Sequence, residues 1–176
     1  IMVKTNAISL LDQELTRKRN EVLLTTGSMS DPYLPLEKDL KLMRGCLEVI
    51  NKHGFGIGIL TKSDLILRDS DLLKVINDKA KVIVDMTITT YDDKLCKVLE
   101  PNVAPTSRRF EVLKEYAKMG IEVGIWLGPI LPFINDDINN LVNILGEAHK
   151  IGVSHIIVFA FGLTLREGNR EYFYQE

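Results

Sequence analysis

Five short apolar runs recur along the chain, and their spacing constrains its fold more than any other feature. Each run is rich in valine, isoleucine or leucine and lacks strict alternation of apolar and polar residues, which is typical of strands buried on both faces. Stretches of helical periodicity separate the runs, and the repeat of about 30–40 residues is the usual size of a strand–helix unit. The expected strands are Glu21–Thr26, Phe55–Thr61, Lys81–Thr87, Ile121–Leu127 and His155–Phe161.

Glycines mark the ends of the intervening helices. Gly54, Gly120 and Gly152 each follow a helical pattern, where glycine readily takes the left-handed conformation that closes a helix. Residues suited to N-cap and first-turn positions mark the starts. The expected helix starts are Asp31-Pro32, Pro105-Thr106-Ser107 and Asn135-Asp136.

This alternation predicts an α/β fold of parallel strands, either an open doubly wound sheet or a TIM-like (β/α) barrel. A helical pattern from Asn6 to about Arg19 precedes the first expected strand, and the chain begins with Ile1 instead of methionine. Five parallel strands do not close a barrel. We therefore expect one domain over residues 1–176, incomplete at its N-terminal end, with its first strand missing or truncated.

The composition is that of an ordinary globular domain, with 45% hydrophobic residues, 26% charged residues and a formal net charge of −2. That charge does not favour nucleic-acid binding, and no apolar run reaches the ~18 residues that cross a bilayer. The two cysteines, Cys46 and Cys96, are too far apart for a short-spaced metal or redox motif. These features predict a cytoplasmic protein without a metal site of its own.

Polar side chains gather where the expected strands end. In parallel α/β folds the carboxyl ends of the strands lie together and form the active site. Hydroxyls, one ammonium and two carboxylates, those of Asp31 and Asp64, at this edge suit a zwitterionic, hydroxyl-bearing small molecule. The cofactor-binding candidates after the first three strands are Ser28, Ser30, Asp31, Lys62, Ser63, Thr87 and Thr89.

Lys62 is the strongest of these candidates, because a lysine at the end of a buried strand has few structural roles. As a point charge it suits a carboxylate, whereas Asp31 suits an ammonium group. Asp31 and Ser63 are equally compatible with helix capping. Thr87 and Thr89 are also ordinary strand formers.

Two arginines, Arg108 and Arg109, lie in the first turn of an expected helix, where a cation opposes the helix dipole. We therefore expect one of them to face the site. Glu100, followed by Pro101, is interpreted as a helix end. No Ser–His–Asp arrangement or phosphate-binding glycine loop is present, so no catalytic residue is predicted.

A run of eight residues, Thr-Gly-Ser-Met-Ser-Asp-Pro-Tyr, follows the first expected strand at 26–33. Further segments follow in order at 61–63, 87–90, 100–102, 105–109, 128–132 and 135–136, over nearly the whole chain. In order and spacing, these segments resemble one branch of the radical S-adenosylmethionine (SAM) superfamily, the spore photoproduct lyase-like and DNA repair photolyase-like proteins.

The resemblance implies a partial (β/α)6 barrel that binds SAM beside a [4Fe-4S] cluster and cleaves it reductively to a 5′-deoxyadenosyl radical. Members hold the cluster through a Cys-x-x-x-Cys-x-x-Cys loop after the first strand, which this sequence lacks. The cluster ligands are therefore expected upstream, in a segment that completes the barrel, and the chain alone is expected to be inactive. Arg109 matches an arginine of the family without a specified role.

The resemblance also implies roles for the strand-end candidates. Ser30, with Ser28 close by, is expected near the methionyl amino group of SAM. Lys62 is expected at the methionyl carboxylate. Thr87 or Thr89 is expected near the ribose.

Two other functions stay open at this point. One is a Schiff-base lyase on a (β/α) barrel, with Lys62 as the nucleophile. The other is a non-catalytic nucleotide-binding module. A nucleic-acid partner is implied by the resemblance only, no membrane partner is expected, and the substrate is not readable from the residues.

Overall fold

The computed structural model describes residues 3–19, 22–158 and 169–175, and it contains a five-stranded sheet. Neighbouring strands are parallel, and their order across the sheet is their order along the chain. The strands are β1 (Leu23–Thr26), β2 (Gly56–Thr61), β3 (Val82–Ile88), β4 (Glu122–Leu127) and β5 (His155–Val158).

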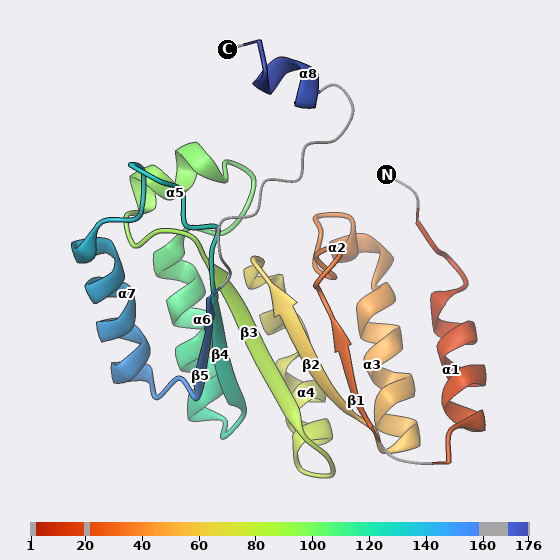
Figure 1. Cartoon of the computed structure of the whole chain (residues 1–176). Coiled ribbons are helices and arrows are strands. Elements are labelled where there is room, and N and C mark those ends of the chain that lie inside the picture. Colours follow the sequence, from red (N-terminus) through yellow and green to blue (C-terminus); the bar gives the residue numbers. More distant parts are fainter. Residues whose placement is uncertain (1–2, 20–21, 159–168, 176) are drawn as a thin grey trace.

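Helices connect the strands, and α3, α4 and α6 lie behind the sheet in the view of Figure 1. The short helices α2 and α5 lie at the carboxyl ends of the strands. The helices are α1 (Ala7–Arg17), α2 (Glu37–Leu40), α3 (Leu42–His53), the 3-10 helix η1 (Asp64–Asp69), α4 (Ser70–Asn77), α5 (Asp93–Leu99), α6 (Thr106–Lys118), α7 (Ile138–Ile151) and α8 (Asn169–Phe173).

All five expected strands are confirmed, with bounds that differ by at most two residues where the structure describes them. Residues 159–161, expected to end the last strand, lie outside the described residues. The glycine stops are also confirmed. Gly54, Gly120 and Gly152 have φ values of 75°, 73° and 82°, the left-handed conformation that closes a helix.

Two of the three expected helix starts are wrong. No helix begins at Asp31, because its carboxylate binds groups of the neighbouring loop and strand; the next helix begins at Glu37. The α7 helix is capped by Asp137, one residue later than expected, whose side chain accepts a hydrogen bond from the Asn140 amide at 3.0 Å. The α6 start at Thr106 is confirmed.

The expectation that the strands are buried on both faces is wrong for β3, where burial alternates residue by residue. Val84 and Met86 point toward the helices and are fully buried in the core. Ile83 and Asp85 point the other way and are partly exposed, on what we call the inner face of the sheet. The alternation arises because successive side chains of a strand point to opposite faces, and the described helices pack on one of them.

The sheet is open within the described residues, since β1 and β5 each pair on one side only. This is a partial α/β barrel, as predicted. Ile1 and Met2, where an earlier strand was expected, lie outside the described residues. No helix in the described part of the chain is long and apolar enough to cross a membrane.

Candidate functional site

Asp31 fastens the loop after β1 to the end of β2. Its Oδ1 accepts hydrogen bonds from the Thr61 hydroxyl at 2.6 Å and the Tyr33 amide at 2.9 Å. Its Oδ2 accepts a hydrogen bond from the Lys62 amide at 2.8 Å. Both carboxylate oxygens are therefore occupied by the chain itself, and Asp31 positions the backbone that carries Lys62.

The same loop passes very close to β2 at Gly27. Gly27 has a φ of 103°, and a Cβ there would overlap the carbonyl oxygen of Leu60, so a residue without a side chain is required. Ser28 and Ser30 follow with exposed side chains. The two serines border different cavities. Ser28 lines a cavity over the inner face of the sheet, whereas Ser30 lines another cavity beside α2 and α3.

Lys62 forms an ion pair with Glu100, and Glu100 also pairs with Arg109 at 2.9 Å through its other oxygen. The three side chains are 33%, 11% and 0% exposed, respectively. Burial acts to raise the pKa of Glu100, but the hydrogen bond from Lys62 and the charge of Arg109 outweigh it and leave that pKa below its usual value. The Glu100 carboxylate is thus held ionised between two cations.

Arg109 is the buried anchor of this bridge. Its guanidinium donates to the carbonyl oxygens of Ala104 at 2.7 Å and Thr87 at 2.8 Å, besides pairing with Glu100. These contacts tie the start of α6 to the end of β3. Arg109 therefore holds Glu100 from within the core and does not line the cavity itself; that one of the two arginines faces a ligand stays a prediction.

Glu100 is the site residue that the sequence analysis missed. It was interpreted as a helix end, and it does follow α5 directly. Its role depends on Lys62 and Arg109, which approach it from β2 and α6. The available signal was a lone carboxylate before Pro101, at the edge of the sheet where Lys62 and one of two arginines were also expected.

The remaining candidates have structural partners. The Ser63 hydroxyl accepts a hydrogen bond from an amide of η1 at 3.3 Å and caps that helix. The buried Thr89 donates from its hydroxyl to the Gly128 carbonyl at 3.1 Å. Thr87 lies on the inner face, with its carbonyl bound to Arg109.

Asn135 fixes the loop that follows β4. It is buried, and its Nδ2 donates to the carbonyl oxygens of Thr89 at 2.6 Å and Pro129 at 3.0 Å. Its Oδ1 accepts a hydrogen bond from the Leu131 amide. Expected at a helix start, Asn135 instead holds one rim of the site.

A cavity of about 440 Å³ opens at these strand ends, within the size range of small-molecule sites. It brings together two predicted residues, Lys62 and Thr89, with Glu100. Within the described residues, no cluster of three histidine, cysteine or acidic side chains is arranged to hold a metal. The lining residues are Lys62, Thr89, Leu99, Glu100, Pro101, Asn102, Val103, Pro129 and Leu131.

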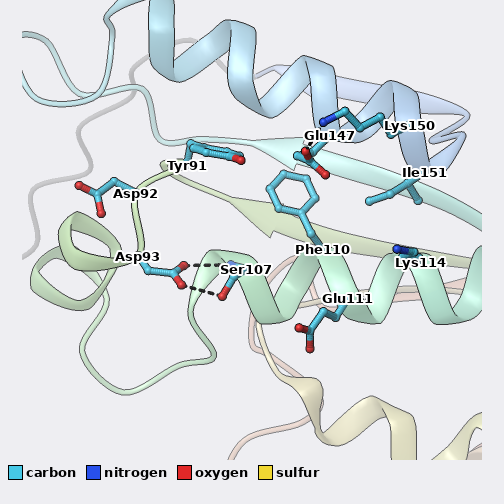
Figure 2. Close-up of a pocket in the computed structure, with 10 residues that line it drawn as sticks. All are labelled: Tyr91, Asp92, Asp93, Ser107, Phe110, Glu111, Lys114, Glu147, Lys150 and Ile151. Atoms are coloured by element: carbon cyan, nitrogen blue, oxygen red, sulfur yellow. Dashed lines mark hydrogen bonds and ion pairs between the residues drawn. The ribbon is translucent and has the colours of Figure 1, made fainter.

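A larger cavity of about 680 Å³ lies on the outer surface, between α6 and α7 (Figure 2). Tyr91 and Phe110 lie near each other there, with ring centroids 6.3 Å apart. Lys150 pairs with Glu147 at 2.7 Å. None of the predicted site residues lines this cavity, so the strand ends are the candidate functional site.

Several curated proteins are similar to the chain in sequence. An uncharacterised protein of Methanocaldococcus jannaschii is 34% identical over 147 residues, covering 84% of this chain and 52% of the relative. An uncharacterised protein of Mycobacterium tuberculosis is 29% identical over 176 residues, covering 98% of this chain and 51% of the relative. The chain spans about half the length of the curated relatives it matches. No protein-family model matches it.

Solved structures with this fold include Streptococcus suis SuiB. The structure of SuiB bound to S-adenosylmethionine matches with a TM-score of 0.60 at 13% identity, covering 96% of this chain and 39% of SuiB. SuiB bound to its precursor peptide SuiA matches with a TM-score of 0.59, over 88% of this chain and 32% of SuiB. The chain therefore shares its fold, a partial α/β barrel, with SuiB.

Proposed function

We propose that this chain is the SAM-binding core of a radical SAM enzyme, with Lys62 as the residue that receives the methionyl carboxylate. The observation that carries the proposal is the ion pair between Lys62 and Glu100 in the strand-end cavity. The Glu100 carboxylate occupies the position at the Lys62 ammonium that a ligand carboxylate would take. SuiB, which shares the fold, is known bound to SAM.

The cavity has the other groups that such a ligand needs. Apolar side chains such as Leu99 and Val103 line one part, which suits the adenine ring and the thioether carbons. Thr89 and Asn102 supply polar groups to the same cavity, which suits ribose hydroxyls. Ser28 and Ser30, which the sequence places near the amino group, border other cavities, so their contact with SAM stays a prediction.

The [4Fe-4S] cluster does not fit the residues of this chain. Its two cysteines lie on separate helices, Cys46 on α3 and Cys96 on α5, whereas such clusters need several cysteine thiolates. We therefore propose that the cluster ligands come from polypeptide outside these 176 residues. This chain supplies the binding and orientation of SAM, while the cofactors supply the reactive chemistry.

A direct binding measurement tests the SAM site on the chain as it is. We expect saturable heat of binding when SAM is titrated into the chain, and Lys62→Ala to weaken it about tenfold or more. Lys114→Ala is the matched control, because Lys114 lines the outer cavity of Figure 2 and should leave SAM binding unchanged. Equal weakening by both substitutions would contradict the assignment of Lys62.

The reaction is tested on a longer protein that carries both this core and a verified iron–sulfur cluster. With dithionite and SAM under anaerobic conditions, we expect 5′-deoxyadenosine, and its formation should be lost in Lys62→Ala. SAM binding without cleavage would instead favour the non-catalytic nucleotide-binding module.

The Schiff-base alternative is weaker on the geometry. A Schiff-base lysine must reach a carbonyl carbon with its amine, whereas the Nζ of Lys62 is held against the Glu100 carboxylate. Borohydride trapping of a carbonyl compound on Lys62 would revive the Schiff-base alternative.

The substrate is a separate question. The peptide bound to SuiB shows that this fold accepts a peptide in that enzyme. A nucleic-acid substrate finds no support in the comparisons or in the net charge of −2.

A further inference from the structure

The inner face of the sheet carries polar side chains in one register row. Asp85 of β3 is paired with Gly124 of β4, and Gly124 is paired with His155 of β5. Residues in register on adjacent strands point to the same face, so Asp85 and His155 stand on the inner face with a glycine between them. A Cβ on Gly124 would overlap both side chains, so this glycine allows the two to meet across a whole strand.

Asp85 is enclosed and lacks a permanent counter-charge. Its side chain is 14% exposed, with His155 Nε2 3.1 Å from Oδ1 and the Trp126 indole N–H donating to Oδ2 at 3.2 Å. The His155 contact is an ion pair only when the imidazole is protonated, and no hydrogen bond to the buried Oδ1 is found among the described residues. Among the described residues, no lysine or arginine pairs with Asp85.

His155 is held on its other side. Its Nδ1 lies 2.8 Å from the Ser154 hydroxyl, which in turn donates to Glu122 at 3.1 Å. These contacts fix the imidazole ring beside Asp85. Burial raises the pKa of Asp85, against the opposing influence of His155, so a positive charge brought next to this carboxylate would be favoured.

An inner-face cavity of about 190 Å³ lies over this row. It extends from Ser28, at the end of β1, to Asp85, Trp126 and His155, so it adjoins the strand-end site. Its volume corresponds to about six water molecules at the ~30 Å³ that each occupies in the liquid, which is room for a small polar group. The lining residues are Leu23, Thr25, Thr26, Ser28, Gly58, Leu60, Ile83, Asp85, Trp126 and His155.

We propose that this inner-face cavity is a second binding site, which takes an organic cation with N–H donors, of the guanidinium type, against Asp85 and Trp126. A cationic donor would hydrogen-bond to the accessible part of the Asp85 carboxylate and would supply a permanent positive charge, which a neutral His155 does not. The indole ring adds a favourable surface for a cation, and an anion would be repelled. The cation site is argued from this geometry. Its role as the substrate site of the enzyme rests on the proposed function.

Trp126 is the single tryptophan of the chain, so its fluorescence reports on this site directly. We would titrate the chain, without SAM, with methylguanidinium chloride in the millimolar range and follow the emission of Trp126. Methylurea is the matched probe, since it has a similar shape and N–H donors but no charge. We expect a saturable change with methylguanidinium and at least about tenfold weaker binding of methylurea. Equal responses to the two probes, or no saturation, would overturn the proposal.

Two variants locate the effect. Asp85→Asn keeps the shape of the side chain and removes the charge, and it should weaken methylguanidinium binding about tenfold or more. Glu147→Gln removes a carboxylate of the outer cavity, which pairs with Lys150, and it should leave the affinity unchanged. Loss of binding in Glu147→Gln with retention in Asp85→Asn would contradict the site. If Asp85→Asn does not fold, the comparison of the two probes on the unaltered chain still decides.

A third probe separates two sources of the cation. N-acetylarginine amide carries the same guanidinium on a peptide unit. Tighter binding than methylguanidinium would point to an arginine side chain of a peptide, and weaker binding to a small free cation. Because these titrations contain no SAM, the inner-face site can fail while the proposed SAM site holds, and the reverse.

Discussion

Arg108 and Arg109 are neighbours in α6, yet they meet different surroundings. At 3.6 residues per turn, consecutive side chains of a helix point about 100° apart. Arg109 turns inward, is fully buried and pairs with Glu100, whereas Arg108 turns outward and pairs with Asp64 at 3.0 Å and Glu111 at 2.8 Å. The sequence predicts that one of the two faces the site, but not which one, because the register of the helix start decides it.

This difference predicts unequal effects of the same substitution. Arg109→Lys cannot reproduce the fork of contacts to two carbonyls and Glu100, and we expect a loss of about 3–5 kcal/mol in the free energy of unfolding. Arg108→Lys is the matched control and should cost below about 1 kcal/mol. Urea denaturation measures both, and equal losses would show that Arg109 is not the anchor.

A second prediction concerns Asp31, whose carboxylate accepts three hydrogen bonds. Asp31→Ala leaves two amides and a hydroxyl without this acceptor, and we expect a loss of about 2–4 kcal/mol in unfolding free energy. Asp39→Ala removes an exposed carboxylate of α2 and should have little effect. Similar midpoints for the two variants in urea denaturation would contradict the role of Asp31.

At the scale of the elements, apolar periodicity was sufficient to predict the strands, and glycines were sufficient to predict the ends of α3, α6 and α7. Both are local signals: short apolar runs, and residues that tolerate a positive φ. The helix starts were less predictable, because Asp31 and Asn135 use their side chains for contacts with distant segments. The ion-pair bridge of Lys62, Glu100 and Arg109 could not be predicted from the sequence for the same reason, because it joins three elements that only the tertiary fold brings together.

Two glycines with different surroundings test the description of the loop after β1. Gly27→Ala introduces a Cβ at φ 103° against the Leu60 carbonyl, and we expect it to destabilise the fold by about 1–3 kcal/mol and to weaken SAM binding. Gly146 lies inside α7 with open space around its Cβ position, so Gly146→Ala should stabilise the fold by about 0.5–1 kcal/mol. Thermal unfolding compares them, and a neutral Gly27→Ala would contradict the close approach.

For the molecule as a whole, two partly buried carboxyl groups have pKa values that are shifted in opposite directions. Glu100 lies at the strand ends, and Asp85 lies on the inner face of the sheet, which the described helices leave open. On the strand-end side, Glu100 is ionised between cations and its pKa lies below the ordinary value of 4.5. On the inner face, the pKa of Asp85 is raised. Glu100 therefore contributes stability that is complete above its ordinary pKa and is lost as pH falls through the lower folded-state value. Asp85 costs stability as pH rises from its ordinary pKa of 3.8 to its raised folded-state pKa.

The acid limb of the stability profile tests this assignment. Glu100→Gln leaves Lys62 and Arg109 without their shared carboxylate, so we expect it to be less stable than the unaltered chain at neutral pH. Below the folded-state pKa of Glu100, the carboxyl group of the unaltered chain is neutral, like the amide of the variant. The unfolding free energies of the two proteins should therefore converge at low pH. Urea denaturation across a pH series measures this difference, and a constant gap at all pH values would contradict the ion-pair role.

The two unpaired edges of the sheet also influence how this chain behaves at high concentration. Within the described residues, β1 and β5 each leave one edge unpaired, with Leu23 and Val158 exposed on them. Such edges are templates for pairing between molecules, and a net charge of only −2 provides little mutual repulsion. Solutions of the isolated chain are therefore expected to lose monomer by edge-to-edge association as they are concentrated, and to stay clearer in dilute, low-salt conditions.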